Sequence, residues 1–396
     1  MVLITDEVLP QLLLSLTTSF QLIWNVPSQP CEKDFGVALH LGQYGFVYNI
    51  HQTFIGEKIG LFYNLGKFPR FVKNLAGRRI AINGGIPQLG DLKLHLAKVH
   101  EDVTQATDED FSGLGVIDFE SWRAVARQNF DELNIYNEAS EDEVRRFHPS
   151  WSDAQVKAKA ALEFNAGAQQ FLLGTLQAVQ KLRPKAQWGF YHYPYCFAQT
   201  AGQSVCAETA VTGNDQLSWL FNSSQLLLPS LYMSQSGSTL QDRAQHVLAA
   251  IRETVRDNRK KRPILPYISL KYQDGGFLSK EDLINSIGLT YDYGGAGVII
   301  WGSSSDVNSV SKCSDMKTYL TETFGPVAEY FNTILSRCSQ VFCGPTYRCQ
   351  PRLRQRRKQP FMSRLDRLSA LSYLVAANPA LGRRTFRREF RCVPWQ

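Results

Sequence analysis

The 396-residue sequence predicts an α/β protein in which parallel strands close into a β/α barrel. Short apolar strands alternate with helical segments over roughly 300 residues, which is the pattern of a parallel sheet with helical crossovers. Acidic and aromatic residues stand where several strands end, and functional groups at the carboxyl ends of parallel strands are typical of a barrel. A doubly wound open sheet is the alternative fold.

The first half of the chain supplies four predicted strands and two long helices. The strands are short apolar or β-branched runs that stop at Pro, Gly or a polar residue. They are Gln21–Pro27, Ile59–Tyr63, Arg79–Asn83 and Gly113–Glu120. Apolar residues at helical spacing predict helices over Leu89–Val103 and Val156–Leu182, and Ser140 followed by three acids predicts a helix N-terminus.

The second half repeats the alternation. The predicted strands are Trp188–Tyr193, which ends at Pro194, and the apolar segments Leu226–Tyr232, Ile264–Leu270 and Gly297–Trp301. Helices are predicted over Asp242–Asn258, Lys280–Ile287 and Asp315–Leu335. The sequence contains neither G-x-G-x-x-G nor a P-loop, which counts against nucleotide binding.

Asp118 and Glu120 end the Gly113–Glu120 strand and are the strongest chemical signal. Residues i and i+2 of a strand point to the same side, so both carboxyls leave one face. Two carboxyls that close cannot both ionise cheaply, and one is expected to hold a proton near neutral pH. A protonated acid beside an ionised partner is what glycosidic bond cleavage requires. The alternative is that the two acids cap the following helix.

Charge is distributed unevenly along the chain. The net charge is +7, but the segment from Arg337 to the end holds 14 basic and 2 acidic residues, so the tail carries +12 and the remainder −5. Such a tail is expected either to be attracted to polyanions or a membrane surface, or to be a solvated extension. Aromatic residues make up 12% of the chain, and Tyr and Trp suit stacking on sugar rings as well as a large core.

The cysteines indicate an oxidising compartment. Their number is even, no C-x-x-C occurs, and four cluster near the end: Cys31, Cys196, Cys206, Cys313, Cys338, Cys343, Cys349 and Cys392. Residues 1–24 hold an apolar core but also Asp6 and Glu7, so an imperfect leader is favoured over a cytosolic protein. The sequence contains no run of 18 or more apolar residues, so no membrane span is predicted. Asn222 lies in a glycosylation sequon.

Five segments, in order and at matching spacing from about Trp24 to Cys349, resemble the animal hyaluronidases. They are Gly115-Val-Ile-Asp-Phe-Glu-Ser-Trp-Arg, Trp188-Gly-Phe-Tyr-His-Tyr-Pro-Tyr-Cys, Leu228-Pro-Ser-Leu-Tyr, Leu265-Pro-Tyr and Ile300-Trp-Gly-Ser-Ser. The resemblance implies a distorted TIM-like barrel over residues 25–335 and an endo-β-N-acetylhexosaminidase. Such an enzyme cuts hyaluronan, and chondroitin more slowly, with retention of configuration and no cofactor. The setting would be secreted, as in venom, or lysosomal.

The resemblance also implies roles for single residues. Glu120 would be the general acid and then the base, with Asp118 sharing its proton. The substrate's own 2-acetamido carbonyl would attack the anomeric carbon, near the hydroxyl of Tyr232. The residues that would hold the sugar chain are Tyr191, Trp301, Tyr267, Arg123 and Ser303.

Each of these assignments has a structural alternative. Tyr191 and Trp301 are also suited to core packing, Arg123 to pairing with a carboxylate, and Ser303 to capping a turn. His192 is expected to face away from the groove rather than to act in catalysis. The seven histidines show no zinc-ligand spacing, so no metal is expected.

The resemblance further implies the disulfides Cys31–Cys313, Cys196–Cys206, Cys338–Cys349 and Cys343–Cys392. The last two belong to a small EGF-like module over residues 336–396. Here the module's final cysteine pair is missing and an Arg-rich stretch, residues 352–358, intervenes. A complete module is therefore doubtful.

Three functions are compatible with these features. The first is an active hyaluronan hydrolase, and the second is a glycosaminoglycan-binding protein without turnover. The presence of both Asp118 and Glu120 speaks against the second. The third is a chitin- or chondroitin-directed glycosidase, although the chitinase pattern D-x-x-D-x-D-x-E is absent because Val116 stands two residues before Asp118. No nucleic acid partner is expected, and local cations such as Arg123 and Lys271 would have to attract a polyanion.

Overall fold

The computed structural model describes residues 20–74, 77–197, 202–338, 342–344, 347–351 and 390–394. Most of the predicted leader and the Arg-rich stretch 352–358 lie outside these residues. No helix within the described ranges is both long and apolar enough to cross a membrane.

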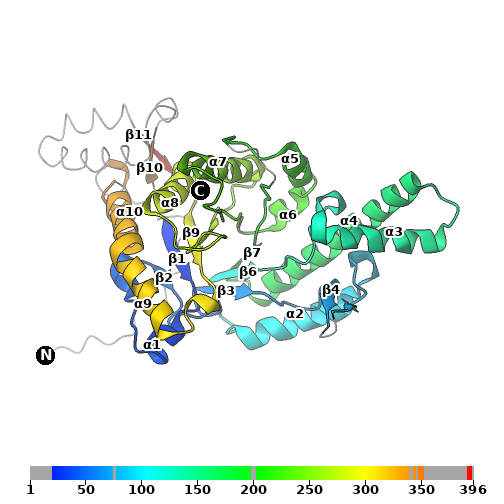
Figure 1. Ribbon diagram of the computed structural model, residues 1–396, viewed down its shortest axis with the longest axis horizontal. Helices are drawn as coiled ribbons and strands as arrows, with labels where there is room; N and C mark the ends of the chain where they lie inside the picture. The colour runs from blue at the N-terminus through cyan, green and yellow to red at the C-terminus, as the bar shows by residue number, and fades with distance from the viewer. Residues whose placement is uncertain are drawn as a thin grey trace, which may run out of the picture.

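Parallel strands form a ring at the centre of the molecule (Figure 1). One sheet has the order β2 (Val47–Tyr48), β1 (Gln21–Asn25), β9 (Gly297–Trp301) and β8 (Tyr267–Ser269). The other has the order β3 (Ile59–Phe62), β6 (Leu114–Ile117) and β7 (Gln187–Phe190). Parallel bridges along segment 226–232 join β7 to β8: Tyr191–Leu228, Leu227–Ile264 and Ser230–Tyr267. The predicted barrel is confirmed, and the open-sheet alternative is wrong.

One side chain closes the ring between β2 and β3. The Asn49 amide nitrogen donates to the carbonyl of Ile59 at 2.8 Å, and its oxygen accepts from the amides of Lys58 and Ile59 at 3.0 Å each. The amide group thus takes the place of a backbone ladder at this seam. The barrel is distorted in this sense, because three of its joins, β7 to segment 226–232, that segment to β8, and β2 to β3, consist of isolated bridges or side-chain bonds instead of continuous ladders.

The barrel interior is filled by alternate strand residues. Ile23, Leu61, Val116 and Ile299 belong to one buried cluster to which several strands contribute. Gly115 points outward between them, where an added Cβ would lie 2.1 Å from the Trp188 ring. Glycine is therefore required at 115 so that the large indole of β7 can pack against β6.

Helices surround the ring (Figure 1). The longer ones are α2 (Leu92–Ala106), α3 (Ile135–Phe147), α4 (Asp153–Leu182), α7 (Leu240–Asp257), α8 (Lys280–Asp292), α9 (Val310–Tyr319) and α10 (Gly325–Cys338). Short helices are α1 (Gln29–Lys33), α5 (Glu208–Asp215) and α6 (Ser218–Ser223). The predicted helix Asp315–Leu335 is α9 and α10 joined by a π-helical turn, Leu320–Phe324. Pro326 explains the turn, because it has no amide to donate to the carbonyl of residue 322.

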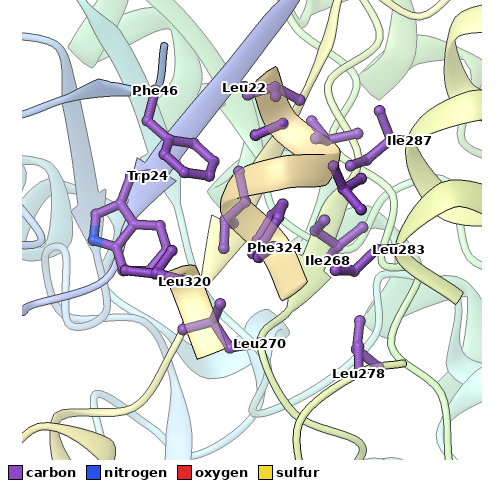
Figure 2. Close-up of a cluster of buried hydrophobic side chains, with 14 of the residues drawn as sticks. Leu22, Trp24, Phe46, Ile268, Leu270, Leu278, Leu283, Ile287, Leu320 and Phe324 are labelled. Carbon is purple, nitrogen blue, oxygen red and sulfur yellow. The ribbon is translucent and has the colours of Figure 1, made fainter. Parts of the chain in front are cut away.

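Figure 2 shows the apolar layer between one side of the ring and these helices. Leu22 and Trp24 of β1 and Ile268 of β8 meet Leu283 of α8 and Phe324 of the π-helical turn. Because β1 and β9 are buried on both faces, β9 and the centre of β1, residues 22–24, are continuously apolar rather than alternating.

Two local expectations differ from the structure. Ser140 lies inside α3 rather than at its N-terminus, because α3 starts at Ile135 after a 3₁₀ turn and the Ser140 hydroxyl donates to the carbonyl of Tyr136 at 2.7 Å. The predicted strand Arg79–Asn83 is real as β5 (Arg79–Ile82), but it pairs antiparallel with β4 (Arg70–Lys73) outside the barrel.

Disulfides tie the ends of the barrel and the C-terminal segment. Cys31 is bonded to Cys313, Cys196 to Cys206 and Cys343 to Cys392, which are the pairs that the resemblance implied. β10 (Tyr347–Pro351) pairs antiparallel with β11 (Phe390–Pro394). Cys349 also forms a disulfide. The Cys338 side chain lies outside the described part, so its pairing with Cys349 and the EGF-like module over 336–396 remain predictions.

Candidate active site

A cavity of about 430 Å³ opens at the carboxyl ends of the barrel strands. Its wall takes one or two residues from each of several strands, since parallel strands all end on the same side of the ring. The polar and aromatic contributors are Tyr63, Asp118, Glu120, Tyr191, His192, Phe197, Ser230, Tyr232, His246, Tyr267, Gln273 and Trp301. Six of the eight predicted catalytic and substrate-binding residues therefore meet at one place.

Asp118 and Glu120 follow β6 and both face the cavity. The Asp118 amide donates to the carbonyl of Phe62 at 3.0 Å, which continues the β3–β6 ladder by one residue. Phe119 between them points the opposite way, stacked on Phe68 with ring centroids 4.1 Å apart. The predicted i, i+2 geometry of the two carboxyls is thus present, and the apolar side of the same segment anchors it.

The two carboxyls contact each other directly. A side-chain hydrogen bond joins them, and burial together with the charge of Glu120 raises the pKa of Asp118 to about 8. Burial also raises the pKa of Glu120, although the bond from Asp118 and the charge of Arg123 oppose this. Such a pair titrates as a unit, so near neutral pH the two carboxyl groups are expected to hold one proton between them.

Arg123 lies beside the acids but does not line the cavity. One guanidinium nitrogen donates to the carbonyl of Gln128 at 2.6 Å. The guanidinium also lies over three rings, with its carbon 4.5 Å from the centroid of Phe130, 5.0 Å from Phe197 and 5.6 Å from Tyr195. These contacts fix a positive charge close enough to lower the pKa of Glu120.

Four predicted aromatic residues form one wall of the cavity. The rings of Tyr191 and Tyr267 meet edge to face at 5.0 Å, and Tyr232 lies 6.1 Å from Tyr191 and 5.8 Å from Trp301. The Tyr191 hydroxyl donates to Ser230 at 3.3 Å. Burial raises the pKa of all three tyrosines, so their hydroxyls remain hydrogen-bond donors at any physiological pH.

Tyr63 is a cavity residue that sequence reasoning missed. It follows β3 directly, and its hydroxyl accepts from the Trp301 indole nitrogen at 2.6 Å. Burial raises the pKa of Tyr63 to about 12, and the charges of Asp118 and Glu120 add to the effect. The signal was available, because Tyr63 ends the predicted strand Ile59–Tyr63 in the same way that Trp301 ends its own.

His192 lines the cavity, and the expectation that it faces away is wrong. Its backbone has φ = 76°, a left-handed conformation that breaks the alternation of the strand. Tyr193 and Tyr195 are consequently buried on the far side, with ring centroids 4.5 Å apart. Burial and the charge of Arg123 lower the pKa of His192 to about 4, so its imidazole is neutral.

Ser303 and Lys271 are engaged elsewhere. The Ser303 hydroxyl accepts from the Ser305 amide at 3.2 Å and caps a 3₁₀ turn, while its own amide donates to Asp306. The Lys271 ammonium pairs with Asp306 at 2.7 Å. Asp306 therefore neutralises one cation that was expected to attract a polyanion.

The predicted disulfide at Cys196 and the predicted glycosylation site at Asn222 differ in their relation to the cavity. Cys196, bonded to Cys206, belongs to the cavity wall, so this disulfide holds the loop after β7 next to the site. Asn222 is half-buried in α6, and its carbonyl accepts from Arg262 at 3.2 Å. Within the described residues, no cluster of His, Cys, Asp and Glu has the arrangement of a metal site.

Comparisons with known proteins identify chains that are similar to this one. A family model described as hyaluronidase matches residues 11–393. The hyaluronidase of Apis mellifera is 39% identical over 321 residues, which is 78% of this chain and 84% of the relative. That of Loxosceles intermedia is 33% identical over 346 residues, or 84% and 85% of the two chains. The crystal structure of bee venom hyaluronidase in complex with a hyaluronic acid tetramer matches with a TM-score of 0.75 at 38% identity, over 78% of this chain and 99% of that chain.

Proposed function

The chain belongs to the hyaluronidase family, and from that premise we propose that it hydrolyses internal β-1,4 N-acetylhexosaminide linkages of hyaluronan. One observation carries the proposal. Two hydrogen-bonded carboxyls, Asp118 and Glu120, retain a proton near neutral pH at the floor of an aromatic cavity. Glycosidic bond cleavage needs a proton donor of this kind beside a sugar-binding surface.

Glu120 is the proposed acid and base. Glu120 is the more exposed residue of the pair and lines the cavity, so it can approach the scissile oxygen there. It protonates the leaving oxygen, and afterwards it takes a proton from the attacking water. Asp118 holds Glu120 in position and supplies the electrostatic coupling that keeps a proton on the pair.

The proposed nucleophile is the substrate's own 2-acetamido carbonyl. Retaining enzymes with a protein nucleophile place two carboxyls about 5–5.5 Å apart on opposite sides of the bond. Within the described cavity wall the only carboxyls are Asp118 and Glu120, and they are bonded to each other. The Tyr232 hydroxyl is a suitable donor to the acetamido group, because its raised pKa keeps it protonated.

The aromatic wall is the proposed sugar-binding surface. Tyr191, Tyr267 and Trp301 present ring faces and edges on which sugar carbons pack, and Tyr63 fixes the orientation of the Trp301 indole. Arg123 stabilises the ionised form of Glu120 from behind, and Ser303 is proposed to contact sugar hydroxyls beyond its capping bond.

Chondroitin is proposed as a poorer substrate of the same cavity, since it carries the same β-1,4 hexosaminide linkage. The protein is proposed to act outside the cytosol, as a secreted or lysosomal enzyme. The disulfides Cys31–Cys313 and Cys196–Cys206 support that setting, because such bonds persist in oxidising compartments.

A reducing-end assay tests the proposal. The full chain and its Glu120→Gln variant are incubated with hyaluronan, chondroitin and chitin oligomers, with Glu101→Gln on α2 as a matched loss of one carboxylate. Release from hyaluronan by the wild type and Glu101→Gln, but not by Glu120→Gln, is expected. Equal release by wild type and Glu120→Gln would refute the catalytic assignment. NMR of the first-formed anomer tests retention.

A further inference from the structure

The antiparallel hairpin β4–β5 forms a concentrated positive surface that the catalytic site does not use. Between residues 65 and 90 the chain has five basic residues and no acid: Lys67, Arg70, Lys73, Arg78 and Arg79. None of the five forms an ion pair with a described carboxylate. Lys73, Arg78 and Arg79 are all exposed near the end of the hairpin, beside the turn at residues 74–78.

The hairpin keeps like charges next to each other. Lys73 of β4 is directly opposite Arg79 of β5 in the strand register, and Arg78 precedes Arg79. Like charges directly opposite on paired strands destabilise the pair. Bonds in both directions between Asn74 and Arg78 nevertheless hold the two strand ends together. An arrangement that costs stability and lacks a counter-charge among the described residues is suited to an anion from outside.

The hairpin is attached to the catalytic end of the barrel. Its chain leaves β3 at Tyr63, which lines the cavity. The indole nitrogen of Trp122, two residues after Glu120, donates to the carbonyl of Pro69 at 2.7 Å. The Phe71 amide donates to the Tyr136 hydroxyl at 3.2 Å. The base of the hairpin is therefore held by the segment that follows the catalytic acid.

We propose that the tip of this hairpin, Lys73, Arg78 and Arg79, is an exosite that binds the carboxylates of the same polyanionic chain outside the cavity. The inference rests on the proposed function. A long hyaluronan chain carries a carboxylate on every second sugar and extends well beyond a cavity of about 430 Å³. The remainder of the chain outside the tail carries −5, so a local cationic surface is needed to attract it.

The test compares two triple variants of the full chain. The first is Lys73→Gln/Arg78→Gln/Arg79→Gln. The matched control, Arg259→Gln/Lys260→Gln/Lys261→Gln, removes the same charge from an exposed segment that leads into β8 at the opposite end of the barrel. Values of kcat/KM are measured on high-molecular-weight hyaluronan and on a hyaluronan octasaccharide at low and physiological ionic strength.

The hairpin variant is expected to lose about fivefold in kcat/KM on the polymer at low salt, mainly through KM, and to show a shallower salt dependence. Its octasaccharide turnover and the control variant's polymer turnover are expected to match the wild type. Equal polymer kcat/KM in the two triple variants, or equal loss on polymer and octasaccharide, would overturn the exosite. Failure of the wild type on both substrates would instead refute the proposed function.

A binding measurement gives an independent readout. Glu120→Gln, with and without the three hairpin substitutions, is applied to immobilised hyaluronan and eluted with salt. Elution of the combined variant at lower salt supports the exosite, and identical elution overturns it. Loss of binding to phosphatidylserine vesicles with unchanged hyaluronan elution would also overturn it, because the hairpin would then contact lipid.

Discussion

Two groups of neighbouring carboxyls in this molecule have different surroundings. Asp118 and Glu120 are hydrogen-bonded to each other at a cavity, and no cation of the described chain forms an ion pair with either. Glu253 and Asp257 lie on α7, where burial and the charge of Glu253 raise the pKa of Asp257 to about 7. There, however, Arg256 contacts Glu253 at 2.7 Å, Asp257 at 3.0 Å and Asp215 at 2.6 Å.

The comparison shows that a raised carboxyl pKa does not by itself identify a catalytic acid. The α7 group, Glu253 and Asp257, is paired with Arg256. The Asn214 amide also donates to Glu253 at 2.8 Å and bonds the backbone of Tyr195. The α7 group stabilises the packing of α5 and α7 behind the site. The Asp118–Glu120 pair has open space and hydroxyl donors around it, so its proton is available to a substrate.

The largest expected effect separates the two groups directly. Glu120→Gln should lower kcat on hyaluronan by at least about 10³-fold, or about 4 kcal/mol, because the proton donor is lost. Glu253→Gln should leave kcat within about twofold but lower Tm, because its bonds to Arg256 and Asn214 hold α5 on α7. Steady-state kinetics and thermal unfolding of both variants measure this. A loss of activity of the same size in Glu253→Gln would contradict the assignment of a catalytic role to one carboxyl group and a structural role to the other.

The pH profile sharpens the same comparison. The shared proton leaves the wild-type pair as pH rises through about 8, so kcat/KM should fall above that pH. In Asp118→Asn the neighbouring carboxyl is gone, and Glu120 loses its proton at lower pH. The alkaline limb should therefore move to lower pH, with kcat reduced about 10–100-fold. An unchanged limb would show that Asp118 does not set the titration.

Arg256→Met tests whether the α7 group is structural. It leaves Glu253 and Asp257 buried without their cation, and since the Arg256 side chain is 38% exposed we expect a loss of only about 2 kcal/mol in unfolding free energy. Urea unfolding at pH 7 measures the loss. The loss should diminish as pH falls below about 7, because the buried Asp257 carboxyl takes up a proton and no longer needs a cation. Unchanged stability at pH 7 would contradict the assignment.

The smallest expected effect concerns backbone strain at the site. His192→Gly relieves the left-handed backbone at φ = 76°, so stability should rise by up to about 1 kcal/mol while kcat/KM falls about threefold or more. His40, exposed and with φ = 52°, is the matched control. His40→Gly should gain stability without loss of activity. A loss of activity in both variants would show that the loss does not depend on the position of His192 in the cavity wall.

Periodicity predicted the barrel and the acid pair, because both depend on local rules. Continuous apolar runs marked the buried strands, and the i, i+2 spacing placed Asp118 and Glu120 on one side. His192 was mispredicted because nothing in Tyr-His-Tyr indicates a left-handed residue. That Arg79–Ile82 forms a hairpin outside the barrel could be known only from its pairing with β4. The α7 group likewise includes an ion pair between Arg256 and Asp215, which comes from another helix. Tertiary pairing of that kind is not encoded in a local window.

The Asn49 seam has a consequence for how the barrel opens. If the ring is imagined as a rolled sheet, its β2 and β3 edges share no backbone ladder. The Asn49 amide group and the loop after β2, through the bond from the Leu61 amide to the Phe54 carbonyl, join them instead. We therefore expect transient unrolling to begin next to β3, one strand away from the acids, and the Lys58 and Ile59 amides to exchange with deuterium sooner than those of β6 or β9.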